Sequence, residues 1–314
     1  MRILLWLLII FVGALFAIFL LARVLIASVP TEPLGQFIKV GDEEIHYVDQ
    51  GAGSPILIIH GASGNLGDME LRLAPALRAA GHRVITIDRP GLGLSSRNDP
   101  ALNDISKQAE LMVALMDQLN VHAPTVVGHS LGGAVALAMA VNHPDRVGGL
   151  VDIAGVSHAW DGDLWWAHQL AGTPVVGWYF CNALMPLAGL ALYDANVAGT
   201  FTPEPVTPPN YSDATQTKMI LRPKAFCNNS SDVRALRDGV RSLNDGYANL
   251  TEPFEVVFGT EDYVSPDLHA AGLERDAPGA NVTLIDGAGH MIHHTQFETV
   301  RDIILRQAAL NTSN

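Results

Sequence analysis

Basic residues are scarce in this 314-residue sequence, which has 19 Lys and Arg against 32 Asp and Glu and a net charge of −13. An acidic surface repels phosphate backbones, and no basic stripe is visible, so we expect no nucleic-acid partner. Charged residues of either sign make up only 16% of the chain, whereas hydrophobic residues make up 48%. This composition excludes an intrinsically disordered chain and indicates a sizeable folded core.

Motifs that bind metals or cofactors are missing as well. The sequence has no His-Glu-x-x-His pattern and no dinucleotide fingerprint, and the pair Gly91-Leu92-Gly93 is too short to be one. We therefore expect no metal and no organic cofactor. Internal repeats and low-complexity tracts are also absent, and the length suits one large α/β domain with an insertion.

The chain contains only two cysteines, Cys181 and Cys227, and they do not form a metal-like Cys-x-x-Cys pair. In an oxidising compartment they would form a disulfide, and otherwise they would be two buried free thiols. The sequence leaves both alternatives open.

Charge is missing altogether between Ile3 and Ala22, a run that also lacks proline. A helix of this length covers about 30 Å, enough to cross the hydrocarbon core of a membrane. A cleaved signal peptide usually has a shorter apolar core, although small residues near Ala27-Ser28 could form a cleavage site. The run has no polar face, which argues against a core helix. We expect residues 1–30 to form a transmembrane anchor and linker, and residues 31–314 to form the folded domain.

The charges that flank this run predict its orientation. Arg2 and the free amine stand at one end, and Arg23 stands at the other, followed by acidic residues from Glu32. This bias favours a single-pass membrane protein with its N-terminus inside and its folded domain on the extracytoplasmic side.

Short apolar runs alternate with helix-like stretches beyond residue 35. Phe37–Val40 and Glu44–Val48 flank Gly41-Asp42, as in a β-hairpin. The later runs suit strands buried on both faces, so the alternation predicts a mostly parallel sheet of about eight strands with helices on both faces. The predicted strands are Pro55–Ile59, Arg83–Ile87, Pro124–Val127, Val147–Ile153, Pro253–Phe258 and Asn281–Ile285, and the predicted helices are Asp104–Leu119, Leu131–Val141, Asp267–Arg275 and Thr295–Ala308.

The alternation is interrupted between about Ser157 and Asp232, which predicts an inserted, mostly helical cap. The segment includes the proline-rich run Pro203–Pro209 and a group of aromatic residues. These rings either form an apolar lid over the site or pack the cap onto the core. The aromatic residues are Trp160, Trp165, Trp166, Trp178, Tyr179 and Phe180.

Ser130 lies in Gly128-His129-Ser130-Leu131-Gly132, between a predicted strand and a predicted helix. A serine in so sharp a turn has strained backbone angles, and the flanking glycines allow strand and helix to approach closely. The five-residue pattern alone occurs by chance, and the bland alternative is a glycine-rich turn with an exposed serine. Its strand–turn–helix context favours a catalytic nucleophile.

A serine nucleophile needs a base within hydrogen-bond reach, an acid behind that base and donors for the oxyanion. Asp262 follows the predicted strand Pro253–Phe258 and is the expected acid, with Glu261 as the alternative. His290 follows the last predicted strand and is the expected base. His293 and His294 compete with it but begin the next helix, and we interpret His60, His129 and His143 as structural.

The chain order Ser130, Asp262, His290 is that of α/β-hydrolases. Together with His60–Gly64 and Asp88–Ser95, it makes the chain resemble the cap-bearing branch of the α/β-hydrolase superfamily over roughly Phe37 to Ala308. The resemblance implies that the backbone N–H groups of Ala62 and Leu131 form the oxyanion hole. It also implies that Asp88–Gly91 packs against the oxyanion turn without a catalytic role.

Two departures narrow the function that the resemblance implies. Epoxide hydrolases and haloalkane dehalogenases place an aspartate where Ser130 stands, and the His-Gly-Gly-Gly motif of one lipase group is absent. The expected reaction is hydrolysis of the carboxylic ester of an apolar or amphipathic small molecule through an acyl-enzyme. Hydrolysis of a carbon–carbon bond in a vinylogous diketone and cofactor-free haloperoxidase or perhydrolase activity stay open. The non-enzyme alternative is a membrane-anchored binding module with an inactive hydrolase fold.

Overall fold

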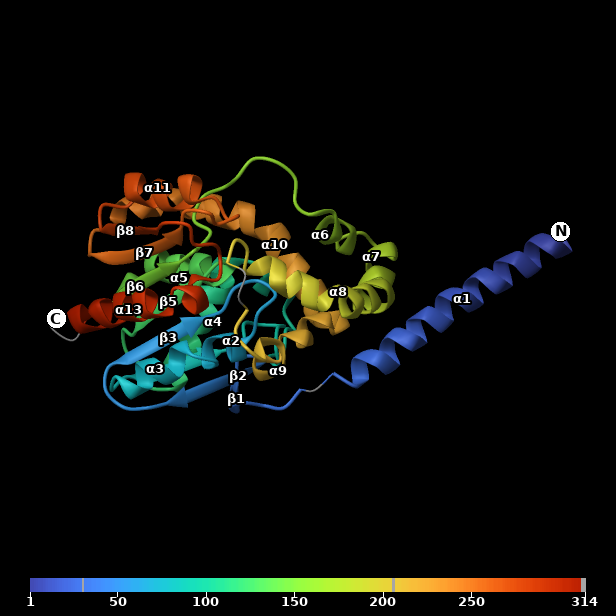
Figure 1. Cartoon of the computed structure of the whole chain (residues 1–314), viewed down its shortest axis with the longest axis horizontal. Helices are drawn as coiled ribbons and strands as arrows, with labels where there is room; N and C mark the ends of the chain where they lie inside the picture. Colours follow the sequence, from blue (N-terminus) through green and yellow to red (C-terminus); the bar gives the residue numbers. More distant parts are fainter. Residues whose placement is uncertain (30, 205–206, 312–314) are drawn as a thin grey trace.

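The computed structural model describes residues 1–29, 31–204 and 207–311 (Figure 1). Pro30 of the expected linker and residues 205–206 of the proline-rich run lie outside the described residues. The predicted division into residues 1–30 and 31–314 stays a prediction.

An eight-stranded sheet forms the centre of the molecule, in the strand order β1-β2-β4-β3-β5-β6-β7-β8. The pairs β1–β2 and β2–β4 are antiparallel, and all other pairs are parallel, which confirms the predicted fold class. The strands are β1 (Gln36–Val40), β2 (Glu43–Gln50), β3 (Pro55–Ile59), β4 (Arg83–Ile87), β5 (Thr125–His129), β6 (Gly149–Ile153), β7 (Phe254–Gly259) and β8 (Ala280–Ile285).

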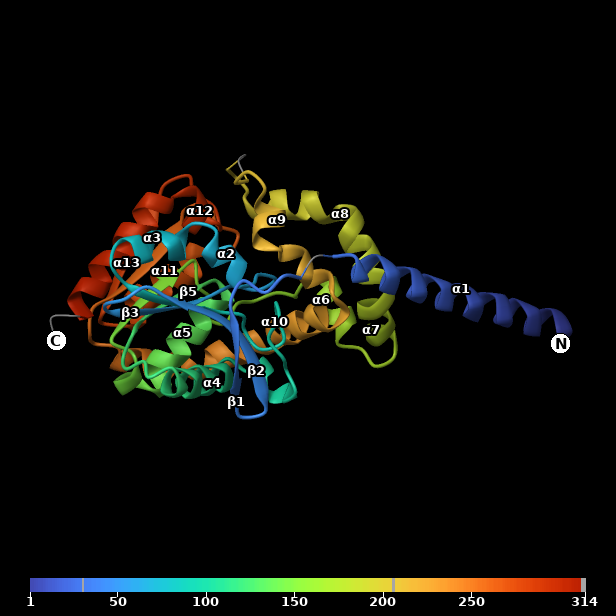
Figure 2. The same cartoon turned by 90° about the horizontal axis from the view of Figure 1, so that it is seen from below.

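The strands are continuous runs of apolar residues in the sequence because both faces of the sheet are buried. Along β3, Leu57 and Ile59 belong to one core cluster, whereas Ile56 and Ile58 belong to the cluster on the opposite face. Helices cover both faces, as Figure 2 shows, which is the reason that no polar alternation appears in the sequence. One face carries α4 (Ile105–Gln118), α5 (Leu131–Asn142) and α11 (Pro266–Asp276); the other carries α2 (Leu66–Glu70), α3 (Leu73–Ala79), α12 (Ile292–Thr295) and α13 (Phe297–Asn311).

The segment between β6 and β7 is mostly helical, as expected for a cap. Its helices α6, α7 and α8 lie between the sheet and the N-terminal helix (Figure 1). In chain order the segment contains α6 (Trp166–Ala171), α7 (Val176–Tyr179), the π-helical turn η3 (Phe180–Leu184), α8 (Met185–Thr200), α9 (Tyr211–Thr215), the 3₁₀ turn η4 (Thr217–Leu221), α10 (Pro223–Leu243) and the 3₁₀ turn η5 (Asn244–Asn249).

Helix α10 joins the cap to the core, so the expected cap boundary at residue 232 falls inside one helix. Its first half carries Phe226, which packs on Phe180 in a small cap cluster. Its second half carries Leu236 and Val240, which pack in the main core. The first half also carries Cys227, which forms a disulfide with Cys181 of η3 and resolves the alternative that the sequence left open.

The N-terminal helix α1 (Arg2–Ala27) extends away from the body (Figure 1). Its apolar window has a mean hydropathy of 3.1 and is not buried inside the protein, so the helix is long and apolar enough to cross a membrane. The stretch Val176–Thr200 passes the same test of length and composition, with a mean hydropathy of 1.3, but it is partly buried. An anchor and a signal sequence both fit the first helix.

Candidate active site

Ser130 occupies the turn between β5 and α5 at the carboxyl end of the parallel strands, where ligands bind in open α/β sheets. Its backbone angles, φ 56° and ψ −120°, lie in a region that L-residues rarely adopt. The turn is held because the Ser130 N–H donates to the carbonyl of Ile153 at 2.9 Å. The strained serine therefore stands at the position that the sequence predicts.

Glycines around Ser130 are required by close backbone contacts. A Cβ on Gly132 would overlap the carbonyl oxygen of Ile59 at the end of β3, and a Cβ on Gly128 would overlap the carbonyl of Gly132. A Cβ on Gly61 would lie 3.0 Å from the Ser130 Cβ. The helix and the strand end thus meet backbone to backbone beside the serine.

Asp262 and His290 lie together at the ends of β7 and β8. His290 Nδ1 is 3.0 Å from each carboxylate oxygen of Asp262, and both side chains are buried. The Val264 N–H donates to the same carboxylate at 2.7 Å and fixes its orientation. This is the geometry of an acid that orients a histidine base through its Nδ1–H.

The competing residues lie elsewhere. Glu261 is exposed, and its backbone N–H donates to the carbonyl of Ala288, so the acid loop and the histidine loop are bound to each other. Among the described residues, Ser130 Oγ makes no hydrogen bond to His290. Catalytic hydrogen bonds are often long in the absence of substrate.

The two expected oxyanion donors have no acceptor within the part of the chain that the structure describes. Ala62 follows β3 and Leu131 opens α5, and neither backbone N–H is hydrogen-bonded. Leaving a buried N–H unpaired costs about 1–3 kcal/mol, so such groups are rare without a functional reason. Both amides are thus available to an oxygen of the substrate.

His60 and Arg89 hold the loop that presents Ala62. His60 Nδ1 bonds the carbonyl of Gly61 at 2.8 Å, and the Arg89 N–H donates to His60 Nε2 at 3.0 Å, so the ring is neutral with its proton on Nδ1. Burial and the neighbouring Arg89 lower the pKa of His60 to about 4. The Arg89 guanidinium also donates to the carbonyl of His60 at 3.1 Å. His60 and Arg89 are therefore architectural, as predicted.

Helix α10 supports this loop from the cap side. Asp232 accepts from Arg89 at 2.8 Å and from Arg97 at 2.6 Å, and all three side chains are buried. The Asn229 side chain accepts from the Ser63 N–H at 2.7 Å. The cap is thus bound directly to the oxyanion loop.

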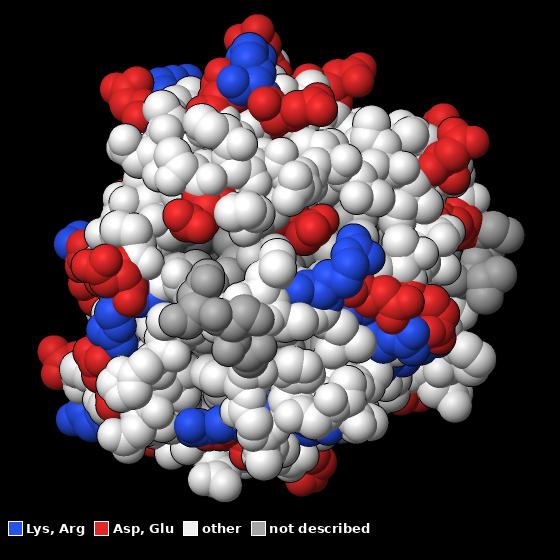
Figure 3. Space-filling model, turned by 90° about the vertical axis from the view of Figure 1, so that its left-hand side faces the viewer, with Lys and Arg blue, Asp and Glu red and all other residues white. Residues whose placement is uncertain are grey.

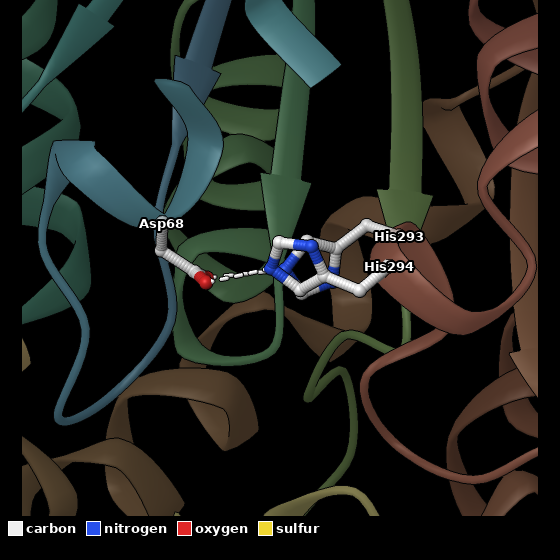
Figure 4. A group of neighbouring side chains, drawn as sticks. All are labelled: Asp68, His293 and His294. Atoms are coloured by element: carbon white, nitrogen blue, oxygen red, sulfur yellow. Dashed lines mark hydrogen bonds and ion pairs between the residues drawn. The ribbon is translucent and has the colours of Figure 1, made fainter. Parts of the chain in front are cut away.

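A second buried cluster binds the His290 loop to α2 (Figure 4). His293 Nε2 lies 3.0 Å and His294 Nε2 2.8 Å from the carboxylate of Asp68, which also accepts from the Tyr211 hydroxyl of α9 at 2.6 Å. Burial alone would raise the pKa of Asp68, but His293 and His294 outweigh burial and hold the pKa well below its usual range. Both histidines are therefore occupied by Asp68, as expected for residues outside the triad.

These three residues could in principle hold a metal ion, because their ligand atoms lie within 4.8 Å of one another. Their ring nitrogens argue otherwise. A histidine that binds a metal through Nε2 donates its Nδ1–H to a neighbouring acceptor. Nδ1 of His293 and Nδ1 of His294 are both buried without a partner in the described structure, which suits neutral rings that donate from Nε2 to Asp68. The donor set thus fits a hydrogen-bonded cluster better than a metal site.

Asp152 of β6 is the most unusual carboxyl group beside the nucleophile turn. It is opposite Gly128 in the sheet and fully buried, and neither carboxylate oxygen has a partner in the described part of the chain. Burial raises its pKa to about 8. Asp152 is therefore protonated at neutral pH and does not replace Asp262 as the acid.

Sequence reasoning missed the residues that position the site from a distance. Asp68 and Asn229 show no local pattern, because their partners are 225 and 166 residues away. Glu204 of the cap accepts from the Gly289 N–H at 3.0 Å beside His290. The adjacent pair His293-His294, placed after the base, was the only available signal of a further cluster.

Comparisons with known proteins identify the family and the fold of this chain. The profile of the α/β hydrolase fold matches residues 54–297. The dihydrolipoyllysine-residue acetyltransferase component of the acetoin cleaving system from Pseudomonas putida is 31% identical over 286 residues, which cover 87% of this chain and 69% of that protein. The 2-hydroxymuconate semialdehyde hydrolase of Pseudomonas sp. (strain CF600) is 38% identical over 112 residues, 35% of this chain and 40% of that one. An esterase structure from Exiguobacterium antarcticum shares the fold, with a TM-score of 0.71 at 21% identity, over 88% of this chain and 100% of that chain.

Replacing Asp68 with Asn should weaken the cluster that holds the His290 loop. The amide leaves at least one buried histidine donor unpaired, so we expect the free energy of unfolding to fall by about 1–3 kcal/mol at pH 7. The pKa of Asp68 lies well below 3.8 in the folded state. The extra stability of the wild type over Asp68→Asn should therefore disappear only as the pH falls below 3.8 and through the folded-state pKa.

Urea unfolding measures the effect, with the exposed Asp213→Asn as the matched control. EDTA should leave the stability of the wild type unchanged. Equal stability of Asp68→Asn and Asp213→Asn would contradict the assignment.

Replacing Asp152 with Asn should remove one pH-dependent contribution to the free energy of unfolding. The folded-state pKa of about 8 lies above the usual value of 3.8 for an aspartate, so the folded protein keeps a proton that the unfolded chain releases between these two pH values. The contribution of Asp152 to the stability therefore falls as the pH rises from 4 to 8, by at most about 1.4 kcal/mol per pH unit. In urea unfolding between pH 5 and 8, the stability of the wild type relative to Asp152→Asn should fall with rising pH, whereas its stability relative to the exposed control Asp145→Asn should stay constant. Parallel profiles for all three proteins would contradict the prediction.

Proposed function

Because this chain belongs to the α/β-hydrolase fold family and is a hydrolase, we propose that it cleaves the carboxylic ester of an apolar or amphipathic small molecule. In this proposal Ser130 is the nucleophile, His290 is the general base and Asp262 is the acid behind it. The observation that carries it is the approach of Asp262 to His290 Nδ1, 3.0 Å from both oxygens, at the sheet edge that carries the strained Ser130.

The mechanism follows from the atoms in place. His290 Nε2 accepts the Ser130 proton as the hydroxyl oxygen attacks the ester carbonyl. Asp262 keeps the proton on His290 Nδ1 and stabilises the imidazolium without itself taking the proton. The unpaired N–H groups of Ala62 and Leu131 donate to the oxyanion. His290 then protonates the leaving alcohol and later activates the water that releases the acid.

The positions of the two amides support this assignment of roles. A preorganised donor stabilises the transition state by about 3–4 kcal/mol, provided that its direction is fixed before the substrate arrives. Arg89 and Asn229 fix the Ala62 loop, and the first turn of α5 fixes Leu131. Neither amide depends on a side chain of its own residue.

Hydrolysis of a carbon–carbon bond is the second candidate. It is favoured by the similarity to 2-hydroxymuconate semialdehyde hydrolase, which covers 35% of this chain. The same triad and oxyanion donors would serve a vinylogous diketone. The two reactions differ in the bond that breaks after the carbonyl has been activated, so a substrate panel separates them.

Replacing Ser130 with Ala should lower kcat/KM for short-chain aryl esters by about 10⁴-fold or more, because the nucleophilic oxygen is removed. The assay uses the full chain in detergent and a panel of esters and ring-cleavage diketones. Ser242→Ala, at an exposed serine of α10, is the matched control and should retain activity. A fluorophosphonate probe should label the wild type and not Ser130→Ala.

Full ester hydrolysis by folded Ser130→Ala would exclude the mechanism. Lack of labelling in the wild type would favour the inactive binding module. Turnover of diketones but not of esters would assign the second candidate instead.

We also propose that residues 3–22 anchor the chain in a membrane and that the hydrolase domain lies on the extracytoplasmic side. The exposed apolar surface of α1 supports the anchor, and the Cys181–Cys227 disulfide supports an oxidising compartment. An anchored enzyme reaches substrates that partition into the bilayer, which agrees with an apolar or amphipathic ester.

The oxidation state of the cysteines in cells tests this placement. Intact cells are lysed directly into a denaturing, non-reducing buffer that contains a maleimide-linked polymer, which modifies free thiols. The protein should stay unmodified, because both of its cysteines are in the disulfide. Prior reduction should add two polymer chains, one for each cysteine. Modification without reduction would place the domain in a reducing compartment and overturn the proposed side.

A further inference from the structure

The cap presents an uncharged surface next to α1. Residues 164–193 contain no Asp, Glu, Lys or Arg. Large apolar side chains on this segment are unusually exposed, including Trp165 at 52%, Trp166 at 60% and Trp178 at 59%. These three rings therefore do not pack the cap onto the core, which was one of the two roles expected for the aromatic residues, whereas Trp160 does pack against the main core. Trp and apolar side chains exposed together are typical of a surface at a membrane interface.

Contacts with α1 show how deep this surface would lie. The Tyr179 hydroxyl donates to the carbonyl of Leu15 at 2.8 Å, and Trp178 stacks on Phe19 with ring centroids 5.7 Å apart. Leu15 precedes Arg23 by eight residues, which is about 12 Å along a helix. If Arg23 lies at the level of the lipid headgroups, α7 lies within the hydrocarbon core of the membrane. The exposed side chains of α7 are apolar, as that environment requires.

A cavity of about 640 Å³ opens at the level of Arg23. It lies between the end of α1, the loop after β4 and the start of α10. Its walls carry four basic residues, Arg23, Arg97, Arg222 and Lys224, and no acidic residue. Such a set is unexpected in a chain with a net charge of −13, because most of its basic residues form ion pairs with acidic ones.

The basic residues of the cavity differ in whether a carboxylate group already pairs with them. Arg97 forms an ion pair with the buried Asp232, which also pairs with Arg89. Among the described residues, Arg222 donates to the carbonyl of Gly93 at 3.4 Å. Arg23 and Lys224 are exposed and have no carboxylate partner among the described residues. On the face that points away from α1, by contrast, basic residues appear as separate groups among acidic ones (Figure 3).

We propose that this cavity binds the phosphate group of an anionic membrane lipid. Arg23, Arg222 and Lys224 supply donors and positive charge for the phosphate, and Ile26, Ala27 and Val29 supply an apolar wall on the side of α1. The inference rests on the membrane placement proposed above and is independent of the reaction at Ser130. The position at the end of a span favours a lipid headgroup over free phosphate.

The test measures lipid binding by the full chain in neutral-detergent micelles. Phosphatidylglycerol is the probe, phosphatidylcholine with the same acyl chains is the zwitterionic comparison, and inorganic phosphate is the competitor. The variant Arg23→Gln/Lys224→Gln removes the two exposed cations that have no carboxylate partner. Lys39→Gln/Lys107→Gln removes the same charge from exposed positions on β1 and α4.

We expect phosphatidylglycerol to bind more tightly than phosphatidylcholine. The affinity for phosphatidylglycerol should fall roughly fivefold for each cation removed from the cavity, and the Lys39/Lys107 variant should bind as the wild type does. Equal binding of the two lipids, or no change in Arg23→Gln/Lys224→Gln, would overturn the proposal. Displacement of the lipid by an equal concentration of inorganic phosphate would overturn the lipid assignment in favour of a soluble phosphate. Ester hydrolysis in the same variants should be unchanged in micelles, so failure of this proposal is distinguishable from failure of the proposed reaction.

Discussion

The contact between the start of α5 and the end of β3 is the constraint on which the site depends. Gly132 has no Cβ, so its backbone lies against the carbonyl of Ile59, and the chain can turn from strand to helix only through the strained serine at 130. The same approach brings the loop after β3 next to the first turn of α5. One backbone contact thus places the proposed nucleophile and both expected oxyanion donors, without any side-chain interaction between them.

The other half of the site is held by interactions of long range. The His290 loop is bound to the Asp262 loop by a backbone hydrogen bond, to α2 through Asp68, and to the cap through Glu204. The oxyanion loop is bound to α10 by Asn229. Because helix α10 also packs in the main core through Leu236, the cap cannot shift as a unit without disturbing the loops that carry the chemistry. Buried polar contacts of this kind specify position more than they add stability.

Local patterns explain which features the sequence could predict. Both faces of the sheet are buried, so the strands are continuous apolar runs. The turn at Ser130 contains the glycines that it requires. Each of these patterns spans only a few residues and is visible in the sequence. Asp68, Asn229 and Asp232 could not be found in this way, because each acts on a partner that only the fold brings near. The aromatic cap residues were ambiguous for a related reason. Hydrophobicity indicates that a ring avoids water, but it does not distinguish a protein core from a lipid surface.

The proposed delivery of substrate from the membrane accounts for both the exposed aromatic rings of the cap and the burial of Ser130. Ser130, Asp262 and His290 are only 8%, 7% and 4% exposed, whereas Tyr263, whose ring lies 4.6 Å from that of His290, is 63% exposed. A substrate delivered from bulk water must leave solvent to reach a site so enclosed. A substrate delivered from the bilayer is already desolvated, and the apolar cap beside α1 extends the hydrocarbon environment towards the protein. The proposed anchoring would therefore lower the desolvation cost of binding as well as raise the local substrate concentration, and it would give the uncharged stretch 164–193 a function that packing alone does not explain.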